Sequence, residues 1–409
     1  MNRADSVVST APPAFPMRRA AGCPFDPPAE LRTLQEHEPI SRVTLWDGST
    51  PWLVTRHADQ RALLADPRIS ADVTRDNFPH HSQSARERSR QGLTFLSVDD
   101  PEHSRLRRMV TSPFTNRRME ALRPRVQRVV DHLIDEMLAG PRPVDLVKAF
   151  ALPVPSLVIC ELLGVPYDDH DFFQERSRLL VDREAPREAA LQAQAELRDY
   201  LDRLIGMKTA APGDDLLSQL VLERVGPGEL TRQELADLGV FLLIAGHETT
   251  ADMIALGTAA LLEHPDQLAD LRRAADDKET AGPVEELLRY LTVTHGGRRR
   301  IATEDIDWAG LTIRAGDGLV FATDIGNRDA EVFDAPDRLD LRREARRHVA
   351  FGFGAHQCLG QALARIELQV AYRTLLQRLP GLRLAVRSEE LRFKHTGQVY
   401  GVADLPVTW

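Results

Sequence analysis

The sequence of 409 residues predicts a mainly α-helical protein with a smaller β-rich region, folded as one large domain. Helical periodicity dominates the chain from Glu102 to Leu288, whereas segments with strand-like alternation cluster towards its two ends. No internal repeat, low-complexity tract or shift in composition marks a boundary between domains. We therefore expect a single domain over residues 21–409, preceded by a flexible, polar segment over residues 1–20.

The first regular elements that we expect are a β-hairpin and a short helix. Ser41–Trp46 and Pro51–Thr55 are short strand-like runs, and Asp47-Gly48-Ser49 between them is a turn signal. His57–Ala65 has the pattern of a helix. The stretch from Asp66 to Leu96 is polar and rich in arginine, and we expect no regular structure there. A segment of this length without regular structure is often functional.

Helices are expected through the middle of the chain, separated by prolines such as Pro166 and Pro186. Thr231 and Glu234 have the spacing of a capping box, which predicts the start of a long helix to Leu262. Strands are expected over 306–320 and after Pro380. The other segments with helical periodicity are 102–111, 117–139, 151–163, 168–181, 187–207, 283–290 and 361–379.

The composition excludes several classes of protein. Lys+Arg 52 against Asp+Glu 61 gives 52 − 61 = −9, a balance that argues against a nucleic-acid binder. Three widely spaced cysteines provide neither a disulfide framework nor zinc spacing, which suits a reducing cytoplasm. The apolar run from Leu238 to Leu262 contains His247, Glu248 and Asp252, so we expect a buried helix and no membrane span. A cytoplasmic monomer is the expectation.

The stretch from Phe351 to Gly360 combines two phenylalanines, three glycines and one cysteine, Cys358, immediately before a predicted helix. A helix N-terminus favours negative charge, so we expect it to lower the pKa of the Cys358 thiol and to favour metal binding. The glycines permit backbone angles and close approaches that a Cβ atom would prevent, so a large flat cofactor could lie against the loop. A thiolate ligand on haem iron favours cleavage of the O–O bond.

The pattern Phe-x-x-Gly-x-x-x-Cys-x-Gly resembles the haem-binding loop of the cytochrome P450 family. The resemblance implies the cytochrome P450 fold and haem b, with Cys358 as the iron ligand. It also implies that Arg300 binds a haem propionate, although the neighbouring Arg298 and Arg299 remain alternatives for this role. The other residues that the resemblance places against the cofactor are His103, Arg107, His356, Phe351, Gly352 and Gly360.

Ala245-Gly246-His247-Glu248-Thr249-Thr250 is similar to the oxygen-activating stretch of the same family. The resemblance implies that Glu248 supplies protons, that Thr249 holds water or an oxygen species at the iron, and that Gly246 and Ala245 leave room for oxygen and substrate. From the residues alone, a helix bent by its own threonine hydroxyls is the alternative. His247 and His295 could contact substrate or be satisfied core histidines.

Glu286 and Arg289 lie one helical turn apart, which alone indicates no more than a surface ion pair. The family's Glu-x-x-Arg pair is instead buried, and the resemblance implies that Arg338, in Pro336-Asp337-Arg338, is its third partner. Removing any member of a buried triad would leave an uncompensated charge.

The resemblance is strongest to soluble bacterial members of the family, particularly those of actinomycete secondary metabolism. It implies O2-dependent hydroxylation or epoxidation of an apolar small molecule such as a macrolide, polyketide or terpenoid. Electrons would come from NAD(P)H through a ferredoxin reductase and a ferredoxin, which Arg107, Arg108 and Arg365 could contact unless they are merely solvated. A peroxide- or nitric-oxide-using haem-thiolate enzyme and a non-catalytic haem-binding protein are the alternatives.

Overall fold

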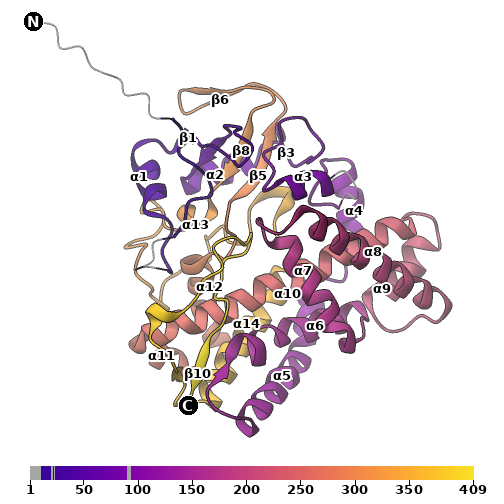
Figure 1. Cartoon of the computed structure of the whole chain (residues 1–409), viewed down its shortest axis with the longest axis vertical. Helices are drawn as coiled ribbons and strands as arrows, with labels where there is room; N and C mark the ends of the chain where they lie inside the picture. Colours follow the sequence, from indigo (N-terminus) through magenta and orange to yellow (C-terminus); the bar gives the residue numbers. More distant parts are fainter. Residues whose placement is uncertain (1–10, 20–21, 23, 90–93) are drawn as a thin grey trace, which may run out of the picture.

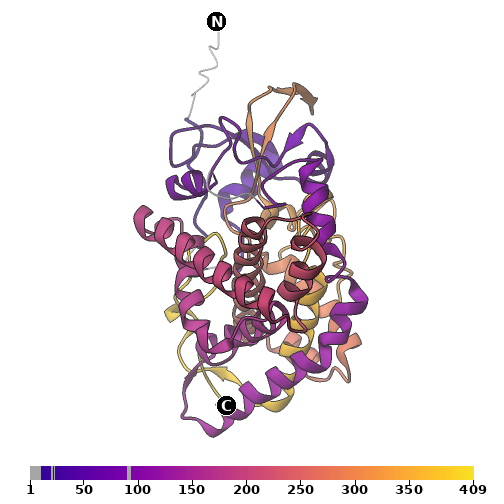
Figure 2. The ribbon, with the colours of Figure 1, turned by 90° about the vertical axis from the view of Figure 1, so that its right-hand side faces the viewer.

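A computed structural model describes residues 11–19, 22, 24–89 and 94–409 and confirms the predicted class, mainly helical with a smaller β-rich region. Both views place the five-stranded sheet at one end of the molecule and helices α5 and α14 at the other, with the C-terminus at that second end (Figures 1 and 2). The largest apolar core lies among the helices, and two smaller cores flank the sheet.

The predicted helices are found at or near their expected bounds. The long ones are α4 (Glu102–Thr111), α5 (Asn116–Ala139), α6 (Pro153–Leu163), α7 (His170–Val181), α8 (Arg187–Ala210), α10 (Arg232–Glu263), α12 (Asp277–Leu291) and α14 (Gln361–Arg378). The shorter ones are α1 (Ala29–His37), α2 (His57–Ala65), α3 (Gln83–Arg88), α9 (Leu216–Leu220), α11 (Pro265–Arg272) and α13 (Thr323–Gly326). Helix α14 packs along α5, and α10 packs against α6, α8 and α14.

The five-stranded sheet has the order β1-β2-β8-β5-β3, and the predicted hairpin forms its β1-β2 edge. Strand β5 pairs antiparallel with β8, so Arg298 lies opposite Phe321 and Arg300 opposite Leu319. Its strands are β1 (Ile40–Arg42), β2 (Trp52–Val54), β8 (Gly318–Phe321), β5 (Arg298–Ala302) and β3 (Ile69–Ser70). The smaller sheets contain β4 (Val144–Asp145), β10 (Pro406–Thr408) and β9 (Arg383–Leu384), and β6 (Ile306–Trp308) with β7 (Leu311–Ile313).

Helix α10 runs through the helical core and begins at the predicted capping box. The Thr231 hydroxyl accepts from the Glu234 N–H, and the Glu234 carboxylate accepts from the Thr231 N–H at 2.7 Å. In the part of the chain that the structure describes, α10 is the one helix long and apolar enough to cross a membrane, but 72% of its most apolar window is buried inside the protein. Burial on most sides explains its apolar composition.

Two predictions about irregular segments need correction. The stretch from Asp66 to Leu96 contains strand β3 and helix α3, the latter capped by the Ser82 hydroxyl, which accepts from the Ala85 N–H. In the segment predicted to be flexible, residues 11–19 pack on the protein, because Phe15 and Met17 are buried in the core beside β2. Residues 1–10, 20 and Cys23 lie outside the described part.

Candidate active site

The loop that carries Cys358 is closed by a backbone hydrogen bond from the Cys358 N–H to the Phe351 carbonyl, at 2.9 Å. Gly352 and Gly354 both have a φ of 75°, which disfavours any residue with a Cβ atom. A Cβ atom at Gly354 would also lie 2.5 Å from the Leu64 carbonyl oxygen. At Gly360 a Cβ atom would meet no protein atom within 4 Å, so the chain itself does not demand a glycine there.

The Cys358 sulfur lies shortly before the first turn of α14, as the sequence predicts, but its thiol pKa is not lowered. Burial raises the pKa of Cys358, and this effect exceeds the opposing effects of Arg298, the Gly360 N–H and two further arginines. The prediction of a lowered thiol pKa is therefore wrong for the protein without a bound metal ion. The N-terminus of a helix does not compensate for the solvation that the Cys358 thiolate loses on burial. A bound metal ion deprotonates a coordinating thiol outright.

Four cationic or imidazole side chains surround the cysteine loop with buried polar atoms that have no partner in the described part of the chain. These atoms are His103 Nε2 and Arg107 Nη1 on α4, Arg298 Nε on β5 and His356 Nδ1 on the loop. The His103 and His356 rings are 4.2 Å apart, and Arg107 Nη2 donates to the Gln357 carbonyl at 2.6 Å. Burial lowers the pKa of both histidines, that of His356 to about 3, with help from Arg300.

Buried polar atoms without partners are costly, and the two guanidinium atoms among them are donors that fit a ligand bringing its own acceptors. The carboxylates of haem propionates are such acceptors, and a cysteine sulfur beside them fits an iron ligand. The structure brings His103, Arg107 and His356 together beside the cysteine loop. The residues present therefore fit haem.

Strand alternation separates the three consecutive arginines of β5. Arg299 points away from the cysteine loop, because its guanidinium donates to the carbonyls of Pro79 at 2.8 Å and Gly296 at 3.1 Å. Arg298 and Arg300 share the opposite face: Arg298 lies close enough to Cys358 to influence its pKa, and Arg300 does the same for His356. Arg298 was only an alternative in the sequence reasoning, although period-two alternation would have paired it with Arg300.

In the α10 stretch, the Thr249 hydroxyl donates to the Ala245 carbonyl at 3.0 Å, as expected for a threonine that bonds to its own helix. The expectation that Gly246 leaves room for oxygen is not supported. A Cβ atom at Gly246 would lie 2.8 Å from the Ile159 side chain, so this glycine lets α10 approach α6.

Glu248 is a buried carboxylate with several cationic or imidazole neighbours. Its Oε1 lies 3.5 Å from His247 Nε2, and the other ring nitrogen of His247 contacts the Leu243 carbonyl at 2.7 Å. Burial raises the pKa of Glu248, but the His247 hydrogen bond and the charges of Lys394 and Arg178 more than offset this and lower it. Glu248 is therefore ionised near neutral pH, and His247 is fully buried beside it.

Helix α14 connects the cysteine loop to α10. Its buried Glu367 hydrogen-bonds to Thr250, and the Tyr372 hydroxyl donates to the Met253 carbonyl. A Cβ atom at Gly257 would collide with that hydroxyl, so the glycine permits the close contact between the two helices. The relative position of the cysteine loop and the Glu248-Thr249 stretch thus depends on the packing of α14 against α10.

The Glu286–Arg289 pair is fully buried, but its third partner is Arg343 and not Arg338. Arg289 forms two hydrogen bonds with the Glu286 carboxylate, at 2.7 and 2.8 Å, and Arg343 Nε donates to it at 3.1 Å. The Arg338 side chain is 71% exposed and lies near Asp340. Arg338 contributes only its backbone carbonyl, which accepts from Arg289 and Arg343.

The sequence reasoning missed Glu285, which lies next to this pair on α12. Its carboxylate contacts His348 at 3.0 Å and Arg365 at 2.6 Å. Burial raises the pKa of Glu285, but these two hydrogen bonds outweigh burial and hold it at about 2. Arg365 is therefore committed to this ion pair, and the contact ties α12 to α14 immediately after the cysteine loop.

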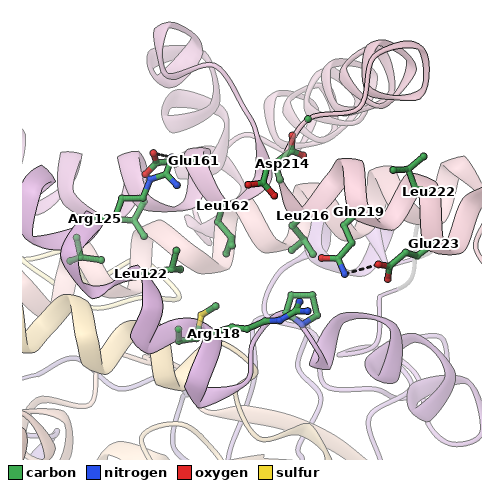
Figure 3. A pocket seen from close by; sticks show the side chains of 16 residues that line it. Arg118, Leu122, Arg125, Glu161, Leu162, Asp214, Leu216, Gln219, Leu222 and Glu223 are labelled. Carbon is green, nitrogen blue, oxygen red and sulfur yellow. Dashed lines mark hydrogen bonds and ion pairs between the residues drawn. The ribbon is translucent and has the colours of Figure 1, made fainter.

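A separate hollow of about 390 Å³ lies among α5, α6 and α9 (Figure 3). Its walls mix leucines such as Leu122 and Leu162 with charged side chains, including the ion pair of Arg125 and Glu161. None of the predicted site residues lines this hollow.

Comparisons with known proteins agree with this site. The family model described as Cytochrome P450 matches residues 30–381. The chain is 54% identical over 399 residues to cytochrome P450 GfsF of Streptomyces halstedii, covering 97% of this chain and 96% of that protein. The crystal structure of GfsF matches with a TM-score of 0.91, covering 97% of this chain and all of that one.

Two further relatives have names that state a reaction or a product. The chain is 53% identical over 401 residues to pentalenic acid synthase of Streptomyces avermitilis, covering 98% of each. It is 42% identical to the mycinamicin VIII C21 methyl hydroxylase MycCI of Micromonospora griseorubida, solved bound to mycinamicin VIII, with a TM-score of 0.91 and coverage of 97% and 100%. The chain belongs to the cytochrome P450 family and is a monooxygenase of that family.

Proposed function

We propose that this protein is a cytoplasmic haem-thiolate monooxygenase that inserts one oxygen atom of O2 into an apolar small molecule. The observation that carries the proposal is the set of unpartnered buried polar atoms around Cys358: His103 Nε2, Arg107 Nη1, Arg298 Nε and His356 Nδ1. Haem b bound there supplies the oxygen-activating chemistry, with the Cys358 sulfur as its iron ligand. Arg300, beside His356, completes the cationic wall for the propionates.

Glu248 and Thr249 supply what the chain itself contributes to oxygen activation. Thr249 offers a hydroxyl that is held by the Ala245 carbonyl and can turn between that carbonyl and a neighbouring acceptor. Glu248 is buried and ionised, so it can accept a proton from the solvent side and pass it towards Thr249. His247 Nε2 lies 3.5 Å from the Glu248 carboxylate and can position it.

Electrons are proposed to come from NAD(P)H through a ferredoxin reductase and a ferredoxin. Of the three arginines considered for contact with the ferredoxin, Arg365 is held by Glu285 and Arg107 is half-buried with its guanidinium against Gln357. Arg108 is exposed, and among the described residues its guanidinium has only a local hydrogen bond to the Ser104 carbonyl. It is therefore the best of the three for an acidic partner.

The proposed substrates are apolar secondary metabolites, such as macrolides, polyketides or terpenoids. Similar proteins include a hydroxylase solved with mycinamicin VIII and a pentalenic acid synthase, which supports this class. Addition of such scaffolds to the oxidised enzyme should produce a spin-state shift of the Soret band, and the compound with the largest shift is the first to test for turnover.

The proposed reaction is tested by reconstitution with ferredoxin, reductase and NAD(P)H, compared with peroxide alone. We expect product only with the full electron-transfer system, and Thr249→Ala should consume NAD(P)H with much less product while it retains haem. Turnover with peroxide alone, or a normal product yield per NAD(P)H in this variant, would contradict the proposal. Cys358→His should abolish the strongly red-shifted Soret band of the reduced carbon monoxide complex.

A further inference from the structure

A second buried acid lies one helical turn after Glu248 on α10. Asp252 is 2% exposed, and its Oδ1 accepts from Lys394 Nζ at 2.8 Å. Its other oxygen, Oδ2, has no hydrogen-bond partner within the described residues. A buried carboxylate oxygen without a donor is costly, and a proton on that oxygen removes most of the cost.

The C-terminal run, which includes residues 392–404, packs closely against this acid. A Cβ atom at Gly401 would lie 2.1 Å from Asp252 Oδ1, so the position accepts only glycine. The Lys394 N–H donates to the Gly401 carbonyl at 2.8 Å, which holds the lysine and the glycine together over the acid. This arrangement places Lys394 against Asp252 and leaves part of the lysine at the surface.

Three titratable or charged groups face Asp252, and a fourth lies beside them. Glu248 and His247 come from its own helix, Lys394 from the C-terminal run, and Arg178 from α7 faces Glu248 and Lys394. Residues four apart on a helix lie on one face, so the two carboxyl groups are neighbours.

Lys394 is the member of this group that reaches the surface, and both acids are buried. The Lys394 side chain is 30% exposed, that of Asp252 is 2% exposed and that of Glu248 is 8% exposed. Burial, with the charge of Glu248, raises the pKa of Asp252 to about 7, despite the opposing effect of Lys394. The pKa of Glu248 is lowered, so below a pH of about 7 Asp252 carries a proton while Glu248 is ionised.

Lys394 is not itself the proton donor. Burial lowers its pKa, but Asp252 and Glu248 outweigh burial and raise it, so the ammonium keeps its proton. Its role is to hold Asp252 and to stabilise the carboxylate that remains after Asp252 gives up a proton.

We propose that Asp252 supplies the protons that Glu248 passes on, and that Lys394 positions Asp252 and stabilises its ionised form. The inference rests on the role proposed above for Glu248. In the step, the O–H bond of the Asp252 carboxyl breaks and an O–H bond forms on the Glu248 carboxylate. Asp252 then regains its proton from water that enters beside the exposed part of Lys394.

The competing explanation is purely structural: the Lys394–Asp252 pair ties the C-terminal run to α10. A structural tie would change the melting temperature and the amount of folded protein. It would not change the solvent isotope effect or the pH dependence of product formation, so these two measurements separate the explanations.

The test uses the haem-loaded enzyme with ferredoxin, reductase, NAD(P)H and the scaffold that gives the largest Soret shift and is converted to product. It compares wild type with D252N, K394M, K394R and E248Q. In D252N we expect product per NAD(P)H to fall by about tenfold or more, because a shape-matched amide cannot supply a proton. The solvent isotope effect should increase. The decline in activity above pH about 7, where wild-type Asp252 loses its proton, should disappear.

The lysine variants test its positioning role. K394M should move the decline to higher pH, because loss of the cation makes Asp252 harder to ionise, whereas K394R should restore the wild-type profile. Arg392→Met is the matched control. Arg392 lies in the same C-terminal segment, but it forms an exposed ion pair with Asp404 and does not contact Asp252 among the described residues. It should leave coupling and the pH profile unchanged.

An infrared measurement gives a readout that does not depend on turnover. The difference spectrum of wild type minus D252N should show a protonated carboxyl C=O band at pH 6 that disappears as the pH passes about 7. If D252N does not fold, the carboxyl band is compared between wild type and the other two variants. In K394M it should persist to higher pH than in wild type, and in R392M it should disappear at the same pH as in wild type.

Two outcomes overturn the inference and separate it from the proposed function. Wild-type coupling and isotope effect in D252N, together with impaired E248Q, would remove Asp252 from the path and leave Glu248 in its role. Wild-type behaviour of E248Q would contradict the role of Glu248 itself, and the inference would fail with it.

Discussion

Glu286 has no exposed side-chain surface and is surrounded by donors: two guanidinium groups and the Asp340 N–H. A buried carboxylate is stable only when its charge is balanced and its oxygens are hydrogen-bonded, so each partner matters more than a surface ion pair would. At the scale of single residues, buried charge therefore decides which side chains this protein cannot lose.

Arg343→Met should lower the free energy of unfolding by about 3–5 kcal/mol, because it removes one of the two cations from buried Glu286. The control is Arg338→Met, whose side chain is 71% exposed and which should change stability by less than about 0.5 kcal/mol. Urea unfolding of both variants measures the difference. Equal losses in the two would show that Arg343 has no special role beside Glu286.

Glu367 predicts a pH-dependent stability. Burial raises its pKa to about 8, despite a hydrogen bond to Thr250, so the folded protein binds this proton more tightly than the unfolded chain does. The free energy of unfolding should therefore fall as pH rises from about 4.5 to about 8, by a few kcal/mol. Glu367→Gln should flatten this decline in unfolding measured at pH 5 and pH 8. An equally steep decline in the variant would assign the effect to another group.

At the scale of elements, α10 joins the capping box at its start to the oxygen-activating stretch at its middle. Its contacts with α6 and α14 are close because Gly246 faces Ile159 and Gly257 faces Tyr372. Each glycine lacks a Cβ atom where a neighbouring side chain lies, so α10 can pack close to α6 and α14. This close packing fixes the position of the Glu248-Thr249 stretch relative to those helices.

Thr231→Ala should lower the free energy of unfolding by about 1 kcal/mol, because the first turn of α10 loses the hydroxyl that accepts from Glu234 N–H. Thr209→Ala is the matched control: this exposed threonine donates only to the Ile205 carbonyl near the end of α8. Denaturant unfolding should separate the two variants. A loss of equal size in both would show that the capping box does not stabilise α10.

At the scale of the whole molecule, the loop after α7 is joined to the turn at residues 395–398. Arg183 Nη1 donates to the Gly397 carbonyl at 2.9 Å and Nη2 to the His395 carbonyl at 2.7 Å. The Arg183 N–H also donates to the Thr396 carbonyl, at 3.1 Å. One side chain thus holds together two segments that are far apart in the sequence.

Arg183→Ala should loosen this contact without unfolding the helical core. We expect faster hydrogen exchange in the two segments, residues 182–186 and residues 394–399. Arg187→Ala, which breaks the exposed pair with Glu87 at 2.7 Å, is the control and should leave both unchanged. Unaltered exchange in Arg183→Ala would show that backbone pairing alone holds the two segments.

Much of the fold and the cysteine loop could be predicted from the sequence, because these depend on local chemistry. Helical periodicity, the Thr231 capping box, the turn between β1 and β2 and the loop before α14 each reflect residues close together in the chain. The loop pattern around Cys358 and the Glu248-Thr249 pair were also sufficient to predict the family, which the comparisons confirm.

The tertiary structure decided what depends on residues brought together from distant positions. Arg343 replaced Arg338 beside Glu286, Arg298 joined Arg300 beside the cysteine loop, and Lys394 came to lie against Asp252. Burial, which reversed the predicted shift in the Cys358 pKa, likewise depends on the whole packed molecule. Local sequence shows which groups a segment carries, whereas charge balance and solvation in a core depend on every element packed around them.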